Sequence, residues 1–390
     1  MFSRLVMGLA LAMVGAAAAI AQDEVVKPGA DVPPILKVGS PAPDFNLPGI
    51  DGKKHSLKEY GGTKVLVLIF TCNHCPVAQM YEKRIKQLVT DYKGKSVNFV
   101  AINPNDPNAV HLSEQGHTDV GDTLSEMKIR ADFRNFNFPY LTDGETQAVA
   151  LKYGPTATPH AFIFDQKRIL RYQGRLDSSQ REELVTKHET RDAIDALLAD
   201  KPVAVENTPA VGCSTKWAYK EAGAKAEVAK TDQEAIAIDL INVDGLKALR
   251  TNNTGKWILL NFWATWCEPC VAEFPELQKM LRMYRKRPFG VVTVSINVPD
   301  ERKQVLSFLE QQKAITKNLL FGFNDPADGI AAFGTDWSGG VPYTVLLSPK
   351  GEVLFRSQGK FDALQVKRAI LKALPDDHYI GTHAYWNSIF

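Results

Sequence analysis

The stretch Trp263-Ala-Thr-Trp-Cys-Glu-Pro-Cys270 places two cysteines where an apolar run gives way to a helical pattern. The run Trp257–Phe262 predicts a buried strand, and apolar residues at helical spacing after Cys270 predict a helix that packs one face inward. Unpaired N–H groups at a helix N-terminus stabilise a thiolate, which lowers the pKa of a thiol placed there and makes it reactive. The stretch therefore predicts a redox-active cysteine pair at a strand–helix junction.

A second junction of the same kind lies earlier in the chain. The apolar run Val65–Phe70 precedes the motif Cys72-Asn-His-Cys75, and another amphipathic helical pattern follows. The motif Cys267-Glu-Pro-Cys270 lies 195 residues further on, which is half of the 390-residue chain. The spacing therefore predicts a duplicated architecture.

The composition limits the classes of function. The hydrophobic fraction of 45% is ample for buried cores, and the formal net charge of +2 does not indicate nucleic acid or an anionic membrane surface as a partner. The five cysteines comprise the two pairs and Cys213. So few cysteines in a long chain indicate redox or metal chemistry rather than a disulfide framework.

The first residues predict an export signal. Met1-Phe-Ser-Arg4 is positively charged, residues 5–20 are uncharged and mostly apolar, and Ala19-Ile-Ala21 offers a small-residue cleavage site. The apolar run is short for a membrane span, which needs about 20 residues, so we expect cleavage of residues 1–21 rather than an uncleaved anchor. The mature protein would then be periplasmic or secreted and not an integral membrane protein.

Strand and helix patterns alternate in two long segments. Residues 38–200 and 239–375 each predict an α/β unit, in which helices flank a mixed central sheet. Residues 22–37 predict a flexible arm, and residues 201–238 predict a linker with a helix in its second half. Residues 376–390 form an aromatic tail without an interpretable pattern.

Both units resemble the thioredoxin superfamily. The second resembles the thiol–disulfide reductases of the TlpA/ResA type over residues 239–374, on the motif containing Trp266 and on Glu273-Phe-Pro275. The first resembles the redoxin branch, which includes peroxiredoxin relatives, on its cysteine pair and on Thr158-Pro159. The resemblance implies two tandem thioredoxin-like domains that exchange disulfides and use no organic cofactor.

In the second site the resemblance implies a two-cysteine exchange. Cys267 would attack a partner disulfide, and Cys270 would resolve the mixed disulfide. Glu273 matches a family glutamate that tunes thiol pKa, although it could instead be an ordinary charge near the start of the helix. Val341-Pro342 would form a cis-proline loop that faces the cysteines and presents backbone groups to the partner chain.

In the first site Cys72 would attack, Cys75 would resolve, and Pro159 would lie in the cis-proline loop. A cationic His74 would stabilise the Cys72 thiolate, although His74 could instead be a solvated residue at the helix start. A more stable thiolate makes a disulfide more oxidising, so we predict that the first pair has the higher reduction potential.

The first unit departs from its relatives. It lacks the Pro and the Thr or Ser that peroxiredoxins place ahead of the reactive cysteine, so peroxide reduction by that mechanism is not expected. Ala78 stands where Glu273 stands in the second unit, and Met80 replaces the helix proline Pro275.

Two alternatives stay open at this level. Cys72, His74 and Cys75 could hold copper(I) or zinc, with redox activity only in the second unit, although a tetrahedral zinc site would need four ligands. Cys213 could be a free thiol in the linker, a relay between the two pairs, or a residue that resolves a Cys72 intermediate. The expected partners are thiols and disulfides of exported proteins and a membrane electron donor.

Overall fold

The computed structural model describes residues 32–144, 146–334, 337–375 and 382–388. The predicted signal peptide (1–21) and most of the predicted arm (22–37) lie outside the described residues. No helix in the described part of the chain is long and apolar enough to cross a membrane.

The first sheet is mixed, as predicted. Its strand order is β5-β4-β3-β7-β8, with parallel pairing among the first three and antiparallel pairing from β3 to β7 to β8. The strands are β3 (Val65–Phe70), β4 (Val97–Asn103), β5 (Tyr140–Thr142), β7 (His160–Phe164) and β8 (Leu170–Gly174). A short hairpin of β1 (Asn46–Pro48) and β2 (Lys54–Ser56) precedes them.

Strand β3 is buried on both faces and divides the first core. Val65, Val67 and Ile69 pack with α1 (Pro76–Asp91), α2 (Leu124–Arg134) and α4 (Glu189–Leu198). The alternate residues, Leu66, Leu68 and Phe70, pack with α3 (Ala150–Tyr153) and with side chains from the segment before β3. This alternation follows from the two-residue period of a strand.

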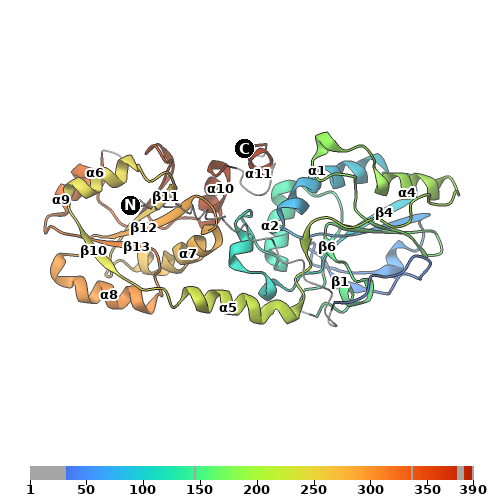
Figure 1. Cartoon of the computed structure of the whole chain (residues 1–390), viewed down its shortest axis with the longest axis horizontal. Coiled ribbons are helices and arrows are strands. Elements are labelled where there is room, and N and C mark those ends of the chain that lie inside the picture. Colours follow the sequence, from blue (N-terminus) through green and yellow to red (C-terminus); the bar gives the residue numbers. More distant parts are fainter. Residues whose placement is uncertain (1–31, 145, 335–336, 376–381, 389–390) are drawn as a thin grey trace, which may run out of the picture. The chain divides into compact units, whose positions relative to one another are not determined.

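The second half of the chain repeats the scheme with one more strand. Its sheet has the order β10-β13-β12-β11-β14-β15, parallel from β10 to β11 and antiparallel from β11 to β15. The strands are β10 (Ile238–Ile241), β11 (Trp257–Trp263), β12 (Phe289–Ser295), β13 (Lys317–Phe321), β14 (Tyr343–Leu347) and β15 (Val353–Gln358). The helices are α6 (Val243–Thr251), α7 (Glu268–Tyr284), α8 (Arg302–Gln311), α9 (Pro326–Phe333) and α10 (Ala363–Ala373). Figure 1 colours the first unit blue to green and the second yellow to red.

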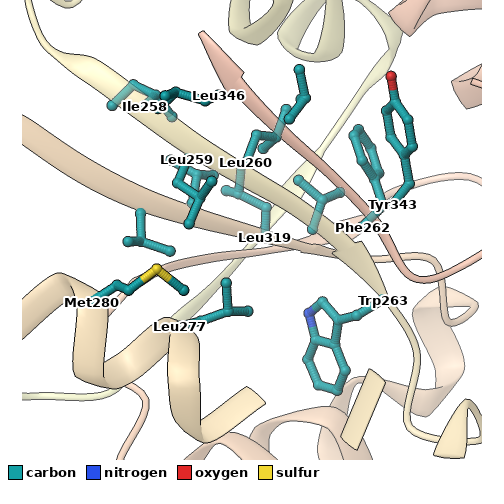
Figure 2. Close-up of a cluster of buried hydrophobic side chains, with 14 of the residues drawn as sticks. Ile258, Leu259, Leu260, Phe262, Trp263, Leu277, Met280, Leu319, Tyr343 and Leu346 are labelled. Atoms are coloured by element: carbon teal, nitrogen blue, oxygen red, sulfur yellow. The ribbon is translucent and has the colours of Figure 1, made fainter. Parts of the chain in front are cut away.

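The central strand β11 carries the core of the second unit (Figure 2). Trp263 packs toward Leu277 and Met280 of α7, whereas Phe262 lies on the other face beside Tyr343. The Phe262 ring stacks on Trp337 with a centroid distance of 4.1 Å. Strand β11 therefore fixes where α7 and its cysteines begin. The predicted class, an α/β fold with two tandem thioredoxin-like units, is confirmed.

The segment predicted as a linker is partly folded onto the first unit. Strand β9 (Cys213–Ser214) pairs with β6 (Ala157–Thr158), and Trp217 is buried in the first core. Burial of an indole side chain stabilises this docking by about 2–3 kcal/mol. The first unit thus continues beyond the predicted boundary at residue 200, and only the helix α5 (Glu221–Thr231) follows the expected linker pattern.

The described part of the tail is also structured. It forms the short helix α11 (Thr382–Asn387), and Trp386 is fully buried.

Candidate functional sites

The second cysteine pair lies at the start of α7. Cys267 occupies the N-cap position, Cys270 lies in the first turn, and the two are joined by a disulfide. The residues around the bridge are open to solvent: Glu268 and Pro269 are exposed, and Trp266 is 63% exposed. The cysteines themselves are 6% and 1% exposed, so it is the exposed flanking residues that leave room for a protein partner beside the bridge.

The cis-proline loop of the second unit lies at the same edge of the sheet. Strand β14 runs antiparallel to β11, with Phe262 opposite Tyr343. Because Val341-Pro342 directly precedes Tyr343 and the cysteines follow Trp263, the sheet register brings the two segments together. The Val341-Pro342 peptide bond is cis, as predicted, and so is Thr158-Pro159 of the first unit.

Glu273 is buried beneath the second pair, one turn after Cys270. Its Oε1 accepts a hydrogen bond from Asn261 Nδ2 at 2.9 Å, and its Oε2 accepts one from the Phe361 amide at 3.1 Å. Burial outweighs these bonds and raises the pKa of Glu273 to about 7. The alternative of an ordinary helix-start charge is wrong, because the carboxyl group is enclosed. At neutral pH it can hold or release a proton beside the thiols.

Replacing Glu273 with glutamine is expected to lower the rate of disulfide exchange at the second pair by about a hundredfold at pH 7. The step near pH 7 in the pH–rate profile should disappear with the titrating group. Stopped-flow oxidation of the reduced pair measures this, with the exposed Glu268→Gln as the matched control. An unchanged pH profile in the Glu273 variant would exclude proton transfer by this residue.

The same carboxyl group predicts a pH dependence of stability. The folded pKa of Glu273 is about 7 and its usual value is 4.5, so the folded state holds the proton more tightly. Stability should therefore fall as pH rises from about 4.5 to about 7, and Glu273→Gln should remove this loss.

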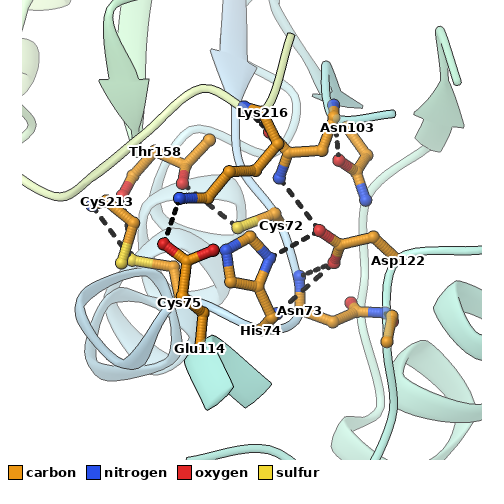
Figure 3. Close-up of polar contacts among 12 residues, drawn as sticks. Cys72, Asn73, His74, Cys75, Asn103, Glu114, Asp122, Thr158, Cys213 and Lys216 are labelled. Atoms are coloured by element: carbon orange, nitrogen blue, oxygen red, sulfur yellow. Dashed lines mark hydrogen bonds and ion pairs between the residues drawn. The ribbon is translucent and has the colours of Figure 1, made fainter. Parts of the chain in front are cut away.

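The first cysteine pair lies at the equivalent junction but is enclosed (Figure 3). Cys72 follows β3, Cys75 is the N-cap residue of α1, and both are free thiols with exposures of 4% and 0%. Cys72 Sγ lies 3.1 Å from Thr158 Oγ1, and Cys75 Sγ lies 3.4 Å from the Thr158 carbonyl oxygen. The pair therefore touches its cis-proline loop directly.

His74 points inward and forms a buried ion pair with Asp122. The distance from His74 Nδ1 to Asp122 Oδ2 is 2.6 Å, and both side chains are shielded from solvent. Asp122 also accepts hydrogen bonds from the Asn73 amide at 2.8 Å and from Asn105 Nδ2 at 2.9 Å. Although burial opposes both shifts, the pair holds the pKa of Asp122 at about 2 and raises that of His74. The alternative of a solvated His74 is therefore wrong.

Of the two cysteines in the first site, Cys75 ionises more readily than Cys72. Burial raises the pKa of Cys72 well above its usual range. Burial also opposes ionisation of Cys75, but hydrogen bonds from Cys213 and Cys72 and the charge of His74 together hold its pKa well below that range. The expectation that His74 stabilises a Cys72 thiolate is thus corrected, since donors converge on the cysteine at the helix N-terminus instead.

The two residues between the first cysteines are anchored, in contrast to those of the second pair. Asn73 Nδ2 donates to the Gly121 carbonyl at 2.6 Å, and the Asn73 carbonyl accepts from Gln79 at 2.8 Å and from the buried Arg130 at 3.2 Å.

Cys213 lies on β9 with its amide N–H 3.3 Å from Cys75 Sγ. The linker cysteine therefore belongs to the first site and contacts Cys75 rather than Cys72.

Three donor groups of the first site could meet at a metal ion. Ligand atoms of Cys72, His74 and Asp122 lie within 4.8 Å of one another. However, Asp122 is already engaged with His74, Asn73 and Asn105, so a metal would more readily use His74 Nε2, which has no hydrogen-bond partner among the described residues. The residues present fit a thiolate–imidazole set better than one that includes the carboxylate.

Sequence reasoning missed Asp122 and Asn105 as site residues. Asp122 and Asn105 lie in or beside a loop rich in Asn, Asp and Gly, where polar residues are ordinary. The cis-proline loop at Thr158-Pro159, by contrast, was expected from the resemblance, and Thr158 contacts both cysteines.

Comparison with known proteins supports the duplicated organisation. Residues 38–173 and 231–356 each match the AhpC/TSA family model. The chain is 33% identical to the thioredoxin-like protein YneN of Bacillus subtilis, over 36% of this chain and 78% of YneN. It is 29% identical to the thiol-disulfide oxidoreductase ResA of Geobacillus thermodenitrificans, over 32% of this chain and 70% of ResA. A solved hypothetical protein of Sinorhizobium meliloti is 31% identical, with a TM-score of 0.42, and the match covers 47% of this chain and 97% of that protein.

These relatives confirm the predicted class, a thiol–disulfide oxidoreductase-like enzyme of the redoxin type. The two matched segments together span well over half of the chain. The chain therefore belongs to the AhpC/TSA family.

Proposed function

We propose that the protein is an exported thiol–disulfide oxidoreductase whose Cys267–Cys270 pair exchanges disulfides with partner proteins, while Cys72–Cys75 is a second redox pair of higher reduction potential. The observation that carries this proposal is the Cys267–Cys270 bridge at a helix N-terminus, beside a cis-proline loop and among exposed residues. The buried Glu273 adds a group that titrates at neutral pH.

The exchange follows from this geometry. In the reduced form the Cys267 thiolate attacks a partner disulfide, and one partner sulfur leaves as a thiolate. Cys270 then attacks Cys267 Sγ in the mixed disulfide, which closes the bridge and releases the second partner sulfur. Glu273 accepts the proton from Cys270, and the backbone at Val341 pairs with the extended partner. The reverse sequence would oxidise a partner dithiol.

The proposed export and the proposed partners follow from disulfide chemistry and from the composition of the first 21 residues. Disulfides persist outside the cytoplasm, and residues 1–21 have the composition of a signal peptide. The partners are then cysteine-containing exported proteins, and reducing equivalents come from a membrane electron donor. The protein's own cysteines carry the electrons, so the exchange needs no organic cofactor.

Partner trapping tests this function. A Cys270→Ala variant keeps the attacking sulfur but cannot resolve the mixed disulfide, so it should accumulate covalent adducts with exported proteins. Cys267→Ala is the control that should trap nothing at the second site. If Cys270→Ala and Cys267→Ala form equal amounts of adduct, the proposed exchange is wrong.

A second candidate function is metal binding by the first unit. It is favoured by His74, whose Nδ1 is fixed by Asp122 while its buried Nε2 faces no hydrogen-bond partner among the described residues. A carboxylate that orients a metal-binding imidazole has this form. Competition of the reduced protein with a chromophoric chelator for copper(I) or zinc tests it. Tight binding lost in His74→Gln would support the metal function, and equal weak binding in both proteins would exclude it.

A further inference from the structure

A short segment of the chain's own backbone lies across the first cysteine pair. Strand β9 runs antiparallel to β6, with Cys213 opposite Thr158 and Ser214 opposite Ala157. Strand β6 leads directly into the cis-proline Pro159. The position beside this loop is where an extended partner chain would form backbone hydrogen bonds to reach the cysteines. In the first unit that position is filled by residues 212–216.

The segment is held by contacts on both sides of Cys213. The Thr215 hydroxyl donates to the Pro155 carbonyl at 2.6 Å, and the Lys216 amide donates to Asn105 Oδ1 at 2.9 Å. Thr215 and Lys216 are buried, and Lys216 Nζ pairs with Glu114 at 2.5 Å. The segment is therefore part of the folded unit.

Gly212 allows the close approach. A Cβ atom at this residue would lie 1.9 Å from the Thr158 carbonyl oxygen, far inside van der Waals contact. Any other residue type would push the segment away from the cis-proline loop. At the second site, by contrast, no described strand pairs with Val341, and Trp266 is exposed.

The cysteine in this segment faces the reactive pair. The amide N–H of Cys213 donates to Cys75 Sγ at 3.3 Å, so the backbone of residue 213 contacts the cysteine at the start of α1. Figure 3 marks this contact with a dashed line from the Cys213 nitrogen to the Cys75 sulfur. The backbone of β9 thus lies beside Cys75, where an extended partner chain would run.

We propose that residues 212–216 form an internal strand that occupies the partner position of the first site, and that Cys213 is a third redox cysteine that forms a disulfide with Cys75. This inference rests on the proposed function, since it needs a Cys72–Cys75 disulfide to form.

The exchange is internal and balanced. The Cys213 thiolate attacks Cys75 Sγ of the Cys72–Cys75 disulfide, a Cys75–Cys213 bond forms, and the Cys72–Cys75 bond breaks. Cys72 leaves as a thiolate and takes the proton that Cys213 gave up. No electrons enter or leave, so no external oxidant is required. The oxidised first site then holds either the Cys72–Cys75 or the Cys75–Cys213 disulfide. A protein partner must displace the internal strand to reach either bond.

Disulfide mapping of single-cysteine variants tests the pairing. The full-length protein is oxidised with glutathione disulfide, quenched in acid, alkylated, digested and analysed by mass spectrometry. Cys72→Ser should form the Cys75–Cys213 disulfide in at least tenfold greater yield than Cys75→Ser forms Cys72–Cys213, because the described hydrogen bonds join Cys213 to Cys75 and not to Cys72. The Cys267–Cys270 peptide is the internal control for oxidation. Equal yields in the two variants, or no Cys75–Cys213 disulfide, would overturn the inference.

The same experiment separates this inference from the proposed function. If the unaltered protein forms no Cys72–Cys75 or Cys75–Cys213 disulfide, the first pair is not a redox pair and both proposals fail for this site. If it forms Cys72–Cys75 while Cys72→Ser gives no Cys75–Cys213 disulfide, only the inference fails.

Opening the internal strand gives an independent measurement. Gly212→Ala should raise the rate of iodoacetamide modification of the reduced first pair at least tenfold, because the added Cβ displaces β9. Gly62→Ala is the matched control, since a Cβ there meets no atom within 4 Å. Circular dichroism checks that both variants fold. Equal modification rates in folded Gly212→Ala and in Gly62→Ala would show that residues 212–216 do not cover the site.

Discussion

Replacing Cys267 with serine is expected to lower the rate of reduction of a disulfide-bonded protein by about a thousandfold. The variant loses the sulfur at the N-cap of α7, which is where the helix stabilises a thiolate. The hydroxyl of serine is far less acidic and cannot form the mixed disulfide. Insulin reduction, followed by turbidity with dithiothreitol as the electron source, measures this loss.

Cys72→Ser is the matched control for that experiment. Asn73 and His74 between the first cysteines are buried, and β9 contacts Cys75, so the first pair should contribute little to the reduction of a large substrate. We expect Cys72→Ser to retain most of the activity. A greater loss in Cys72→Ser than in Cys267→Ser would reverse the roles assigned to the two sites.

Replacing Asp122 with alanine is expected to destabilise the first unit by about 3–5 kcal/mol, because it leaves His74 buried without its partner. It also removes the acceptor of the Asn73 amide, which positions the loop between the two cysteines. Domain unfolding is read from hydrogen exchange of β3 and β4, since a two-domain chain need not unfold in one step. Asp200→Ala, which breaks the exposed ion pair with Lys64, is the control and should cost less than about 1 kcal/mol.

The cost of Asp122→Ala should depend on pH in a defined window. The pKa of Asp122 is about 2 against a usual 3.8, so its contribution is present above about pH 4 and is lost as pH falls toward 2. The pKa of His74 is raised above its usual 6.5, so its contribution is present below 6.5 and is lost as pH rises through the folded value. The destabilisation should therefore be largest between about pH 4 and 6.5. A cost independent of pH would show that the ion pair is not its origin.

Local sequence patterns predicted the elements that hold the second site. The apolar run before Cys267 and the helical stripe after it depend on residues close in sequence, whereas the cis-proline loop at Pro342 was implied by the family resemblance, and the structure has each of them. The duplication was also visible in the sequence, because each cysteine motif follows an apolar run and the two motifs lie half a chain length apart.

The closure of the first site could not be predicted in this way. His74 is paired with a residue 48 positions later, and Cys75 is contacted by one 138 positions later. Neither partner stands in a periodic pattern. Residues 201–217 contain Pro and Gly and resemble a linker, yet Trp217 and the close approach at Gly212 dock them onto the first sheet. Only the folded chain shows that Cys213 belongs to the first site.

The structure also changes the reason for expecting two different redox potentials. The sequence suggested that His74 alone stabilises a thiolate in the first pair. In the structure, hydrogen bonds from Cys213 and Cys72 and the charge of His74 converge on Cys75. Among the described contacts of Cys267 and Cys270 there is no third cysteine. The pKa of Glu273 beside them is raised to about 7, so this carboxyl group is only partly charged at neutral pH. Stabilising one thiolate favours the dithiol form and makes the disulfide more oxidising.

The most direct test of two distinct redox sites is to measure both reduction potentials in one full-length protein. The protein is equilibrated in glutathione buffers, and each pair is quantified by isotope-coded alkylation and mass spectrometry, with Cys213→Ser examined in parallel. We predict that Cys72–Cys75 has the higher potential by at least about 30 mV, which corresponds to a tenfold ratio of equilibrium constants. Equal potentials, or a higher potential for Cys267–Cys270, would contradict the proposed division between the two sites.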